Sequence, residues 1–511
     1  MTLAELVRRV PHARLEADPA LPVTEVTYDS RHLSPGSLFV AIRGAVADGN
    51  RFVDAARKRG AVAVVSEQPP DGAGAWVQVP DAREALALLS AAALGDPARS
   101  LRLVGVTGTN GKTTTTYLID AALRAAGHAV GLIGTVQYRV GGRLLEASRT
   151  TPESSDLQAL FRQMADEGCT DVVMEVSSHS LDLKRVHGCA FEVAVFTNLT
   201  RDHLDFHGDM ERYFAAKRRL FDTYLREGGH AVINADDDRA ADLAAVSRGR
   251  VWTYGIQRKA DVTASGITLS LRGTRFRART PAGELAVETP LIGCFNVENF
   301  LAGLTAALAL GLEPATALAG LVTMTGVPGR LERVSAGQDF AVIVDYAHTD
   351  DALKNLLETL RELKPRRLIT VFGCGGDRDR TKRPLMGAVA SRLSDVVIVT
   401  SDNPRSEPPE AILEEIQRGM NGSRRAERHA IVDRREAISR ALEMAGPGDA
   451  VVIAGKGHET YQVLRDRTVP FDDRQVARDL ILRSRGMDPR SLSGGGGSPS
   501  PPDPPLRGGK A

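Results

Sequence analysis

The sequence has little that would mark a disulfide-bonded protein. Its 511 residues include only four cysteines, Cys169, Cys189, Cys294 and Cys374, and their spacing shows no pairs. This pattern argues against a disulfide framework and a structural zinc site, and it suits a reducing cytosol. It also gives no sign of a catalytic thiol.

Long apolar runs are absent as well. No stretch approaches the roughly 18 uninterrupted apolar residues of a membrane-spanning helix. The N-terminal segment "MTLAELVRRVPHARLEADP" is amphipathic, whereas an export signal has a basic region followed by an apolar one. We therefore expect a soluble, cytoplasmic protein without a membrane span.

The chain has almost no net charge. Lys and Arg number 65 against 64 Asp and Glu, which gives a formal charge of +1. No global field then favours nucleic acid or an anionic membrane, so charge recognition must be local. We expect no nucleic-acid partner, and a monomer.

What is present is an alternation of short apolar runs with helix-like stretches. At about 150 residues each, the length predicts about three domains. Apolar runs at 38–42 and 61–65 indicate a small α/β unit, and strand-helix alternation from 101 to about 330 predicts a mainly parallel sheet covered by helices. Further strand-like runs are expected at 341–344, 368–372, 396–400 and 450–454. We predict α/β domains at 1–100, 101–331 and 332–487, and a disordered Gly/Ser/Pro-rich tail at 488–511.

The segment "VGVTGTNGKTTTT" indicates a phosphate site. A glycine loop between a strand and a helix directs backbone N–H groups at phosphate, while Lys112 can neutralise phosphate oxygens and the Thr113 hydroxyl can bind Mg²⁺. The general pattern G-x-x-x-x-G-K-[ST] needs glycine at the position of Val106, so the match is to the tighter "TGTNGKTT". A chance glycine turn is the alternative, but the strand-loop-helix context favours ATP binding.

Two later segments supply candidate metal ligands. Glu175 ends an apolar run in "VVMEVSSHS", and His203 follows another in "VFTNLTRDHLDFHGD". Mg²⁺ takes few protein ligands besides water and phosphate, which fits Thr113 with Glu175. For His179 and His207 we favour ordinary solvated loop positions.

Lys217 lies on an apolar helical stripe with Tyr213, Phe221 and Tyr224. A buried unpaired ammonium is costly, so one interpretation is that its stem packs while its head reaches solvent. The other is that the neutral amine reacts with CO₂ to give a carbamate, which acts as a carboxylate ligand. Periodicity alone does not choose between them.

Arg405 lies where the strand-like run 396–400 ends and a helix-like stretch begins near Pro408. Ligands of open α/β sheets bind beyond the carboxyl ends of strands, and a guanidinium there matches a carboxylate. A local ion pair with Glu407 or Glu410 is the alternative. This segment alone leaves both open.

The order of "TGTNGKTT", "EVSSHS", "NLTRDHLDFHGDMERYFAAK", "FNVENFLAG", "GVPGRLERV" and "DYAHTDDAL" closely resembles the bacterial Mur ligases, which build the stem peptide of peptidoglycan. The segments "TYDSR", "TTPESS", "FGCGGDRDRTKRPLMG", "DNPR" and "AGKGHETYQ" narrow the resemblance to the MurE type. It covers about residues 20 to 485. It implies an N-terminal α/β domain for the UDP moiety, a central P-loop ATPase-like domain and a C-terminal Rossmann-like domain.

The resemblance also implies a reaction. The γ-carboxylate of the substrate's D-glutamate attacks the γ-phosphate of ATP, and the amine of the incoming amino acid then attacks the acyl phosphate. Catalysis in such a reaction is mainly positioning and charge neutralisation. Implied catalytic groups are Lys112, Glu175, His203 and Lys217. Thr113 and Glu175 would hold one Mg²⁺, and His203 and Lys217 as a carbamate would hold a second near the acyl phosphate.

The remaining implied residues fall into three sets. ATP would contact Gly108, Thr109, Asn110, Gly111, Lys112, Thr113, Thr114, Asn296 and Asn299, with Arg330, Asp345 and His348 reaching it once the third domain closes. UDP-N-acetylmuramoyl-L-alanyl-D-glutamate would contact Ser30, Thr150, Thr151, Ser177 and Arg185. The incoming amino acid would contact Arg378, Asp402, Asn403, Pro404, Arg405, Gly455 and Glu459. Asp350 and Leu183 depart from the family's usual proline and glutamine.

The "DNPR" segment favours meso-diaminopimelate as the incoming amino acid. Diaminopimelate has a carboxylate beside its distal amine, whereas lysine has only the amine, which an arginine would repel. Alternatives are the same ligation with L-lysine, a muramyl ligase that recycles tripeptide, and folylpolyglutamate synthesis. A non-catalytic ATP-binding module is disfavoured by Lys112, Glu175, His203 and Lys217.

Overall fold

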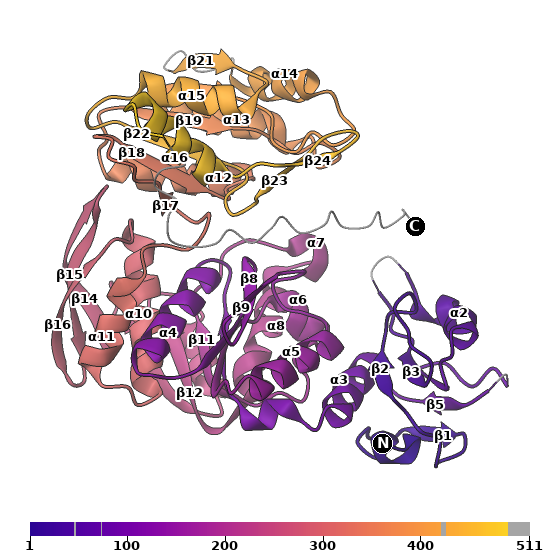
Figure 1. Ribbon diagram of the computed structural model, residues 1–511. Coiled ribbons are helices and arrows are strands. Elements are labelled where there is room, and N and C mark those ends of the chain that lie inside the picture. The colour runs from indigo at the N-terminus through magenta and orange to yellow at the C-terminus, as the bar shows by residue number, and fades with distance from the viewer. Residues whose placement is uncertain (45–46, 73, 421–425, 489–511) are drawn as a thin grey trace. The chain divides into compact units, whose positions relative to one another are not determined.

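The computed structural model describes residues 1–44, 47–72, 74–420 and 426–488 (Figure 1). It divides into two compact units. The first comprises residues 1–268, 275–289 and 295–324, and the second comprises 269–274, 290–294 and the described residues from 325 on. The tail predicted at 488–511 lies outside the described residues, apart from residue 488.

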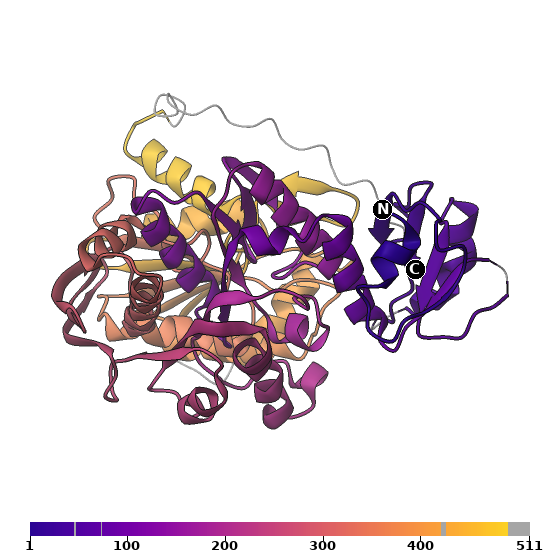
Figure 2. The same cartoon turned by 90° about the horizontal axis from the view of Figure 1, so that it is seen from below.

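The first 100 residues form a five-stranded sheet of order β1-β5-β4-β3-β2, drawn in indigo in Figures 1 and 2. Only β1 is antiparallel to its neighbour. Apolar side chains of α1 and α3 pack on one face and those of α2 on the other. The elements are α1 (Leu3–Val7), β1 (Arg14–Glu16), β2 (Glu25–Thr27), β3 (Ser37–Val40), η1 (Gly49–Phe52), α2 (Val53–Lys58), β4 (Ala63–Ser66), β5 (Trp76–Gln78), α3 (Ala82–Ala93) and η2 (Pro97–Ser100).

An eleven-stranded sheet follows, of order β16-β15-β14-β13-β12-β11-β6-β10-β7-β8-β9. The strands from β13 to β7 are parallel, and β6 lies between β11 and β10. Parallel strands buried on both faces are continuously apolar, as "LVGV" in β6 illustrates. The strands are β6 (Arg102–Thr107), β7 (Val130–Ile133), β8 (Gln137–Val140), β9 (Arg143–Glu146), β10 (Asp171–Glu175), β11 (Phe191–Phe196), β12 (Leu225–Asn234), β13 (Arg250–Gly255), β14 (Val262–Ser270), β15 (Gly273–Thr280) and β16 (Gly283–Thr289).

The helices of this region cover the parallel strands. Apolar side chains of α5 and α8 pack in the core cluster on one face of the sheet, and α4 contacts β6, β7 and β10. The helices are α4 (Lys112–Ala125), α5 (Ser154–Asp166), α6 (Ser178–Asp182), α7 (Leu204–His207), α8 (Met210–Arg219), the π-helix η3 (Leu220–Tyr224), α9 (Ala240–Val246), α10 (Cys294–Ala309) and α11 (Pro314–Thr323). The helix predicted after the glycine loop is thus confirmed as α4.

Two parts of the predicted alternation are wrong. Strands β7, β8 and β9 follow one another without an intervening helix, and so do β13, β14, β15 and β16. In β15 buried and exposed residues alternate, with Arg275, Arg277 and Arg279 exposed. This period of two belongs to a sheet with one solvated face and not to a βαβ unit.

The last described region forms a six-stranded sheet of order β17-β18-β22-β19-β20-β21, parallel except for β17. Helices α12, α13 and α14 pack on one face, and α15 and α16 on the other. The elements are β17 (Glu332–Arg333), β18 (Ala341–Asp345), α12 (Asp350–Glu362), β19 (Leu368–Phe372), α13 (Lys382–Leu393), β20 (Val396–Val399), α14 (Pro409–Met420), β21 (Glu427–Ala430), α15 (Arg434–Met444), β22 (Ala450–Ala454), the hairpin β23 (Tyr461–Val463) and β24 (Thr468–Pro470), and α16 (Asp473–Ser484).

The α/β fold class is confirmed, with three large sheets and a two-stranded hairpin, whereas the domain limits near residues 100 and 331 stay a prediction. Each large sheet presents loops at the carboxyl ends of parallel strands, where open α/β folds bind ligands. In the two largest sheets these loops carry many of the candidate residues, while others, such as Lys217 and Asn299, lie on helices.

Candidate active site

The loop between β6 and α4 has the geometry of a phosphate cradle. Gly108 and Gly111 have positive φ values of 149° and 85°. A Cβ at Gly108 would lie 1.8 Å from Thr197 Oγ1, and one at Gly111 would lie 2.2 Å from Asn299 Oδ1. Both positions therefore require glycine. The loop leads into the N-terminus of α4, where backbone N–H groups favour an anion.

Two lysines meet on one carbonyl oxygen of this loop. Lys112 Nζ donates to Gly108 O at 3.0 Å and to Thr109 O at 2.9 Å. Lys217, more than a hundred residues further on in α8, donates to the same Gly108 O at 2.7 Å. Two lysine amine groups are thus gathered at the loop.

Lys217 is buried, with 1% of its surface exposed. The interpretation in which its head reaches solvent is therefore wrong. Its Nζ lies 4.3 Å from the centre of the Tyr213 ring, and no carboxylate of the described residues lies within 4 Å of it. Burial, followed by the charge of Lys112, lowers the pKa of Lys217 well below its usual 10.5. The side chain therefore favours the neutral amine.

The rest of the loop is tied to the end of β11. Thr109 Oγ1 lies 3.2 Å from Tyr213 Oη, and the Asn110 N–H donates to Asn198 Oδ1 at 2.9 Å. Thr113 is buried in the first turn of α4, and Thr114 is partly exposed. These contacts hold the loop in its observed shape.

His203 begins α7 with a positive φ of 52° and lies beside other aromatic rings. Its ring centre is 4.7 Å from that of His179 and 6.2 Å from that of Tyr213. Burial lowers the pKa of His203 below its usual value, and the charges of Lys112 and Lys217 add to this. His203 thus adjoins Tyr213, whose ring also lies 4.3 Å from Lys217 Nζ.

The prediction of solvated loop positions for His179 and His207 is wrong. His207 is buried, and its Nε2 lies 3.0 Å from Ser178 Oγ. His179 is half-buried against Phe206, at 4.2 Å between ring centres. Aromatic packing explains both positions, which sequence spacing did not reveal.

Glu175 is buried at the carboxyl end of β10. It pairs in register with Val106 of β6, so it lies at the same sheet edge as the glycine loop. Its carboxylate accepts from the Thr135 N–H at 2.8 Å and from Thr135 Oγ1 at 3.2 Å. Thr135 Oγ1 in turn lies 3.0 Å from Thr150 Oγ1.

Further polar residues adjoin this edge. Thr151 Oγ1 donates to Glu175 O at 2.8 Å, and the Ser177 N–H donates to Thr151 Oγ1 at 3.2 Å. Arg185 donates to Thr151 O at 3.0 Å and pairs with the buried Glu153 at 3.3 Å. Thr150, Thr151, Ser177 and Arg185 are therefore brought together by the structure.

Ser30 lies apart from this group, in the loop after β2 of the N-terminal sheet. It is buried, and its carbonyl oxygen accepts from Arg59. Nearby, Tyr28 Oη donates to Asp156 of α5 at 3.3 Å. No described contact joins Ser30 to the other candidate residues.

Asn296 and Asn299 are both buried in α10. Asn299 Nδ2 donates to Asn296 Oδ1 at 3.0 Å, and Asn299 Oδ1 lies against Gly111. Asn299 thus supports the glycine loop directly, a contact that its sequence motif did not suggest.

In the second unit, Asp345 ends β18 and holds the following loop. Its carboxylate accepts from the N–H groups of Leu331 and Ala347, each at 2.8 Å. Burial raises the pKa of Asp345. Arg330 stacks 5.0 Å from the Tyr346 ring, and His348 Nδ1 lies 2.9 Å from Tyr346 O. Arg330, Asp345 and His348 therefore surround one loop.

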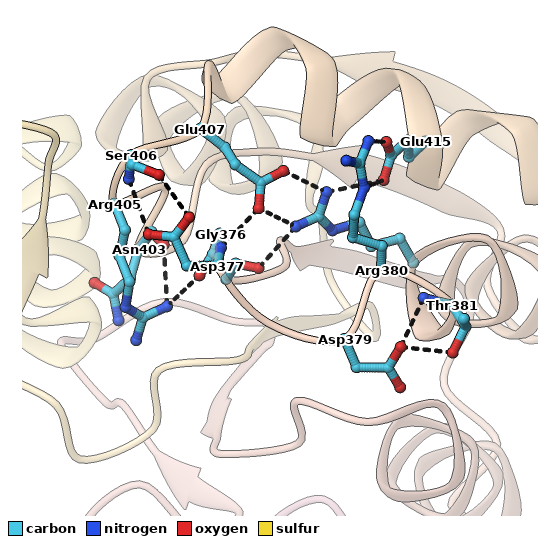
Figure 3. Close-up of polar contacts among 12 residues, drawn as sticks. Gly376, Asp377, Asp379, Arg380, Thr381, Asn403, Arg405, Ser406, Glu407 and Glu415 are labelled. Carbon is cyan, nitrogen blue, oxygen red and sulfur yellow. Dashed lines mark hydrogen bonds and ion pairs between the residues drawn. The ribbon is translucent and has the colours of Figure 1, made fainter. Parts of the chain in front are cut away.

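Arg405 follows β20 and has a positive φ of 53°. Its Nη1 donates to Gly376 O at 2.8 Å (Figure 3). No ion pair joins it to Glu407 or Glu410 within the described ranges, so the local-ion-pair alternative is wrong. Arg378 is exposed in the loop that follows β19, and its side chain lies close to Gly375.

Beside Arg405, the segment Asp402 to Pro404 is buried and faces a lysine that the sequence analysis missed. Lys456 is 0% exposed, and its Nζ donates to Asn403 Oδ1 and to Glu459 Oε2, each at 3.1 Å. Asn403 Nδ2 also donates to Glu459 at 2.9 Å. A Cβ at Gly455 would lie 2.7 Å from Asp402 Oδ2. The segment "AGKGHET" gives no sign that Lys456 is buried, so its sequence alone does not distinguish it from a solvated lysine.

No cluster of three or more His, Cys, Asp or Glu side chains in the described residues is arranged to hold a metal. The predicted set of Thr113, Glu175, His203 and Lys217 includes only two residues of those types. Among the described helices, none has the length and apolar character needed to span a membrane.

Comparisons with known proteins agree with this geometry. Family models match along the chain as "Mur ligase family, catalytic domain" at residues 22–93, "Mur ligase middle domain" at 106–307 and "Mur ligase, glutamate ligase domain" at 329–457. The chain is 51% identical over 493 residues to a UDP-N-acetylmuramoyl-L-alanyl-D-glutamate--2,6-diaminopimelate ligase of Solibacter usitatus, covering 94% of this chain and 98% of that protein. It is 48% identical to the protein of the same name from Geobacillus thermodenitrificans, with 95% and 100% covered.

A solved structure of a UDP-N-acetylmuramoyl-L-alanyl-D-glutamate--2,6-diaminopimelate ligase is 37% identical and has a TM-score of 0.72. The similarity covers 95% of this chain and all of that chain. The predicted family and its three-domain architecture are confirmed. With three family domains in succession and near full-length relatives at about half identity, this chain belongs to the Mur ligase family.

Proposed function

We propose that this protein is the ATP-dependent ligase that joins meso-diaminopimelate to UDP-N-acetylmuramoyl-L-alanyl-D-glutamate in peptidoglycan precursor synthesis. The observation that carries the proposal is the pair of lysines, Lys112 and Lys217, on the single carbonyl oxygen of Gly108. Two anions, a carboxylate and ATP, must approach one another in the first step. The positive charge that Lys112 fixes at the phosphate loop lowers the barrier to that approach.

The first step forms a bond between a D-glutamate carboxylate oxygen and the γ-phosphorus, and ADP leaves. Lys112 and the N–H groups at the start of α4 neutralise charge on the phosphates. In the second step the uncharged amine nitrogen attacks the acyl carbon and loses a proton to solvent. The amide bond forms, and phosphate leaves with the electron pair of the broken C–O bond. The protein's part is to hold the reactants in line.

The donor set fits magnesium. Glu175 offers a carboxylate at the edge where α4 presents the Thr113 hydroxyl, and Mg²⁺ prefers such hard oxygen ligands. We infer that Thr113 and Glu175 would hold one Mg²⁺ and that His203 and carbamylated Lys217 would hold a second. When bound, these ions supply charge neutralisation at phosphate oxygens.

The carbamate follows from the burial of Lys217. Its neutral amine attacks the carbon of CO₂, an N–C bond forms, and one proton leaves to solvent. The product is a carbamate anion next to the cation of Lys112. The buried group at position 217 thereby gains an opposite charge as its neighbour.

The remaining groups divide between the substrates. We infer that Arg185, Ser177, Thr150 and Thr151 bind the muramyl dipeptide and Ser30 its UDP moiety. Asn296, Asn299, Arg330, Asp345 and His348 serve ATP together with the loop from Gly108 to Thr114. All four cysteines are free, as a reducing compartment favours, so we infer a cytoplasmic location.

For the incoming amino acid, Arg405 is the central group. Its guanidinium donates only to carbonyl oxygens among the described residues, so it can receive a carboxylate. We infer that it binds the distal carboxylate of diaminopimelate, with Arg378 on another carboxylate and with Asp402, Asn403, Pro404, Gly455 and Glu459 at the distal end. Lysine has no carboxylate there, and its ammonium would face a cation.

Phosphate release tests the proposal. Enzyme with ATP, Mg²⁺ and UDP-muramoyl dipeptide should release phosphate when diaminopimelate is added, and much less with L-lysine. Equal turnover with lysine would contradict the choice of amino acid. Turnover only with UDP-N-acetylmuramate and free tripeptide would identify a recycling ligase, and no turnover would indicate a binding module.

A further inference from the structure

The loops that follow β19 and β20 are joined around Arg405. Arg405 Nη1 donates to Gly376 O at 2.8 Å, and the Gly376 N–H donates to Asn403 O at 2.9 Å. A Cβ at Gly376 would lie 1.9 Å from Pro404 O, so the loops touch through backbone. The position of the guanidinium is therefore set by both loops together.

These loops carry four carboxylates. Asp379 accepts from Thr381 and Asp402 lies beside Lys456, which leaves two that could neutralise Arg405. The first is Glu407, two residues further on. Instead of pairing with Arg405, it accepts from Arg383 Nη1 at 2.9 Å and Nη2 at 2.8 Å. It also accepts from the Asp377 N–H at 2.6 Å. Figure 3 shows the Glu407 carboxylate turned away from Arg405.

The second carboxylate is that of Asp377. Ser406 occupies both of its oxygens, with Oγ donating at 2.6 Å and the N–H at 3.2 Å. Asp377 is exposed, so its charge is screened by solvent. Of the two carboxylates, Glu407 would therefore be the stronger competitor for the guanidinium of Arg405.

Arg383 is the cation that holds Glu407. It is 0% exposed in α13, and besides Glu407 it pairs with Glu415 at 2.8 Å and donates to Gly375 O at 3.2 Å. A planar, bidentate fork is needed for this arrangement, which lysine cannot reproduce. The hydrogen bonds from Arg383 also lower the pKa of Glu407 to about 2, so this carboxylate is ionised at neutral pH.

We propose that Arg383 is a positioning residue for the incoming amino acid. Its guanidinium binds the Glu407 carboxylate and so keeps the guanidinium of Arg405 available for a substrate carboxylate. This inference rests on the proposed function. Without Arg383, the ionised Glu407 is released beside an arginine two residues away. An internal ion pair then competes with the carboxylate of the substrate.

The test compares Arg383→Met with the double variant Arg383→Met, Glu407→Gln. The KM for diaminopimelate should rise at least tenfold in the single variant, with the KM values for ATP and UDP-muramoyl dipeptide within twofold. The preference for diaminopimelate over lysine should fall by a similar factor. In the double variant no carboxylate is released, so the KM should return to within threefold of wild type.

Arg380→Met is the matched control, because Arg380 pairs with Glu415 in the same helix region without touching Glu407. Its KM values should stay within twofold of wild type. If Arg383→Met does not fold, Arg383→Lys replaces it, alone and combined with Glu407→Gln. The KM for diaminopimelate should then rise at least threefold in Arg383→Lys and return towards the wild-type value in the double variant.

An unchanged KM for diaminopimelate in the single variant would overturn the inference, as would a double variant no better than the single one. Equal rises for all three substrates would indicate general disruption and would also overturn it. Failure of the wild-type enzyme to prefer diaminopimelate over lysine would refute the proposed function instead.

Discussion

The amine of Lys217 donates a 2.7 Å hydrogen bond to Gly108 O, the oxygen that also accepts from Lys112 at 3.0 Å. A helix distant in sequence thereby contacts the phosphate loop through a buried lysine. Because burial favours the neutral amine, this lysine can be modified by CO₂ and can then act as an anion beside ATP. The relationship joins loop geometry to the chemistry of the first step.

Replacing Lys217 by alanine should lower kcat by about 10²–10³-fold, the usual cost of removing one preorganised electrostatic group at a reacting centre. Phosphate release measures it. Arg218→Ala is the control, since Arg218 lies on the exposed side of the same helix with Asp222 and should change kcat less than twofold.

The carbamate makes a separate prediction. Wild-type enzyme depleted of CO₂ should lose activity and regain it on addition of bicarbonate, whereas Lys217→Ala should not respond. Full activity in CO₂-free buffer would contradict the carbamate. The kcat of Lys217→Ala would then decide whether the unmodified amine contributes to catalysis.

Gly111→Ala should raise the KM for ATP at least tenfold. The added Cβ would lie 2.2 Å from Asn299 Oδ1, so the loop or Asn299 must move. Gly127→Ala is the matched control, since its φ of 84° imposes a similar strain of about 1–2 kcal/mol but its Cβ meets nothing within 4 Å. Equal KM effects in both variants would show that backbone strain alone is responsible.

Asp473→Asn should destabilise the second unit by about 3–5 kcal/mol. Arg434 and Asp473 are both 0% exposed and pair at 2.7 Å, so the variant leaves a buried guanidinium without its counter-charge. Urea unfolding measures the loss. Glu288→Gln, which breaks the exposed pair of Arg275 and Glu288, should cost less than about 1 kcal/mol.

The pH dependence of stability should report the pair of Arg383 and Glu407. The pKa of Glu407 falls from 4.5 to about 2 on folding, chiefly through Arg383. Its contribution is therefore fully present above pH 4.5 and is lost as the pH falls towards 2. The difference in Tm between wild type and Glu407→Gln should shrink across this window, and a difference independent of pH would contradict the assignment.

Much of the fold could be predicted from local patterns. Strands β19 and β22 match the expected runs at both ends, because apolar stretches bounded by polar turns have few other structures available. Strands β14 to β16 were missed since their apolar residues alternate with exposed arginines, a weaker signal than a continuous run.

Site residues could be predicted where a glycine position or the order of motifs constrained them. They could not be predicted where the role of a charged side chain depends on its burial. Arg383 and Lys456 have the appearance of surface charges in the sequence, yet both are 0% exposed. Their burial depends on Glu407 and Glu459, which lie 24 and 3 residues away, and only packing brings the charges together. His207 was wrongly expected in solvent for the same reason.

The most direct test of the central claim is a competition assay read by mass spectrometry. Wild-type enzyme with ATP, Mg²⁺ and UDP-N-acetylmuramoyl-L-alanyl-D-glutamate is given equal meso-diaminopimelate and L-lysine, beside an Arg405→Lys variant. We predict that the wild-type product carries diaminopimelate almost alone, and that Arg405→Lys reduces this preference by about 10–100-fold, or 1–3 kcal/mol. A wild-type product carrying lysine, or a preference unchanged by Arg405→Lys, would contradict the account.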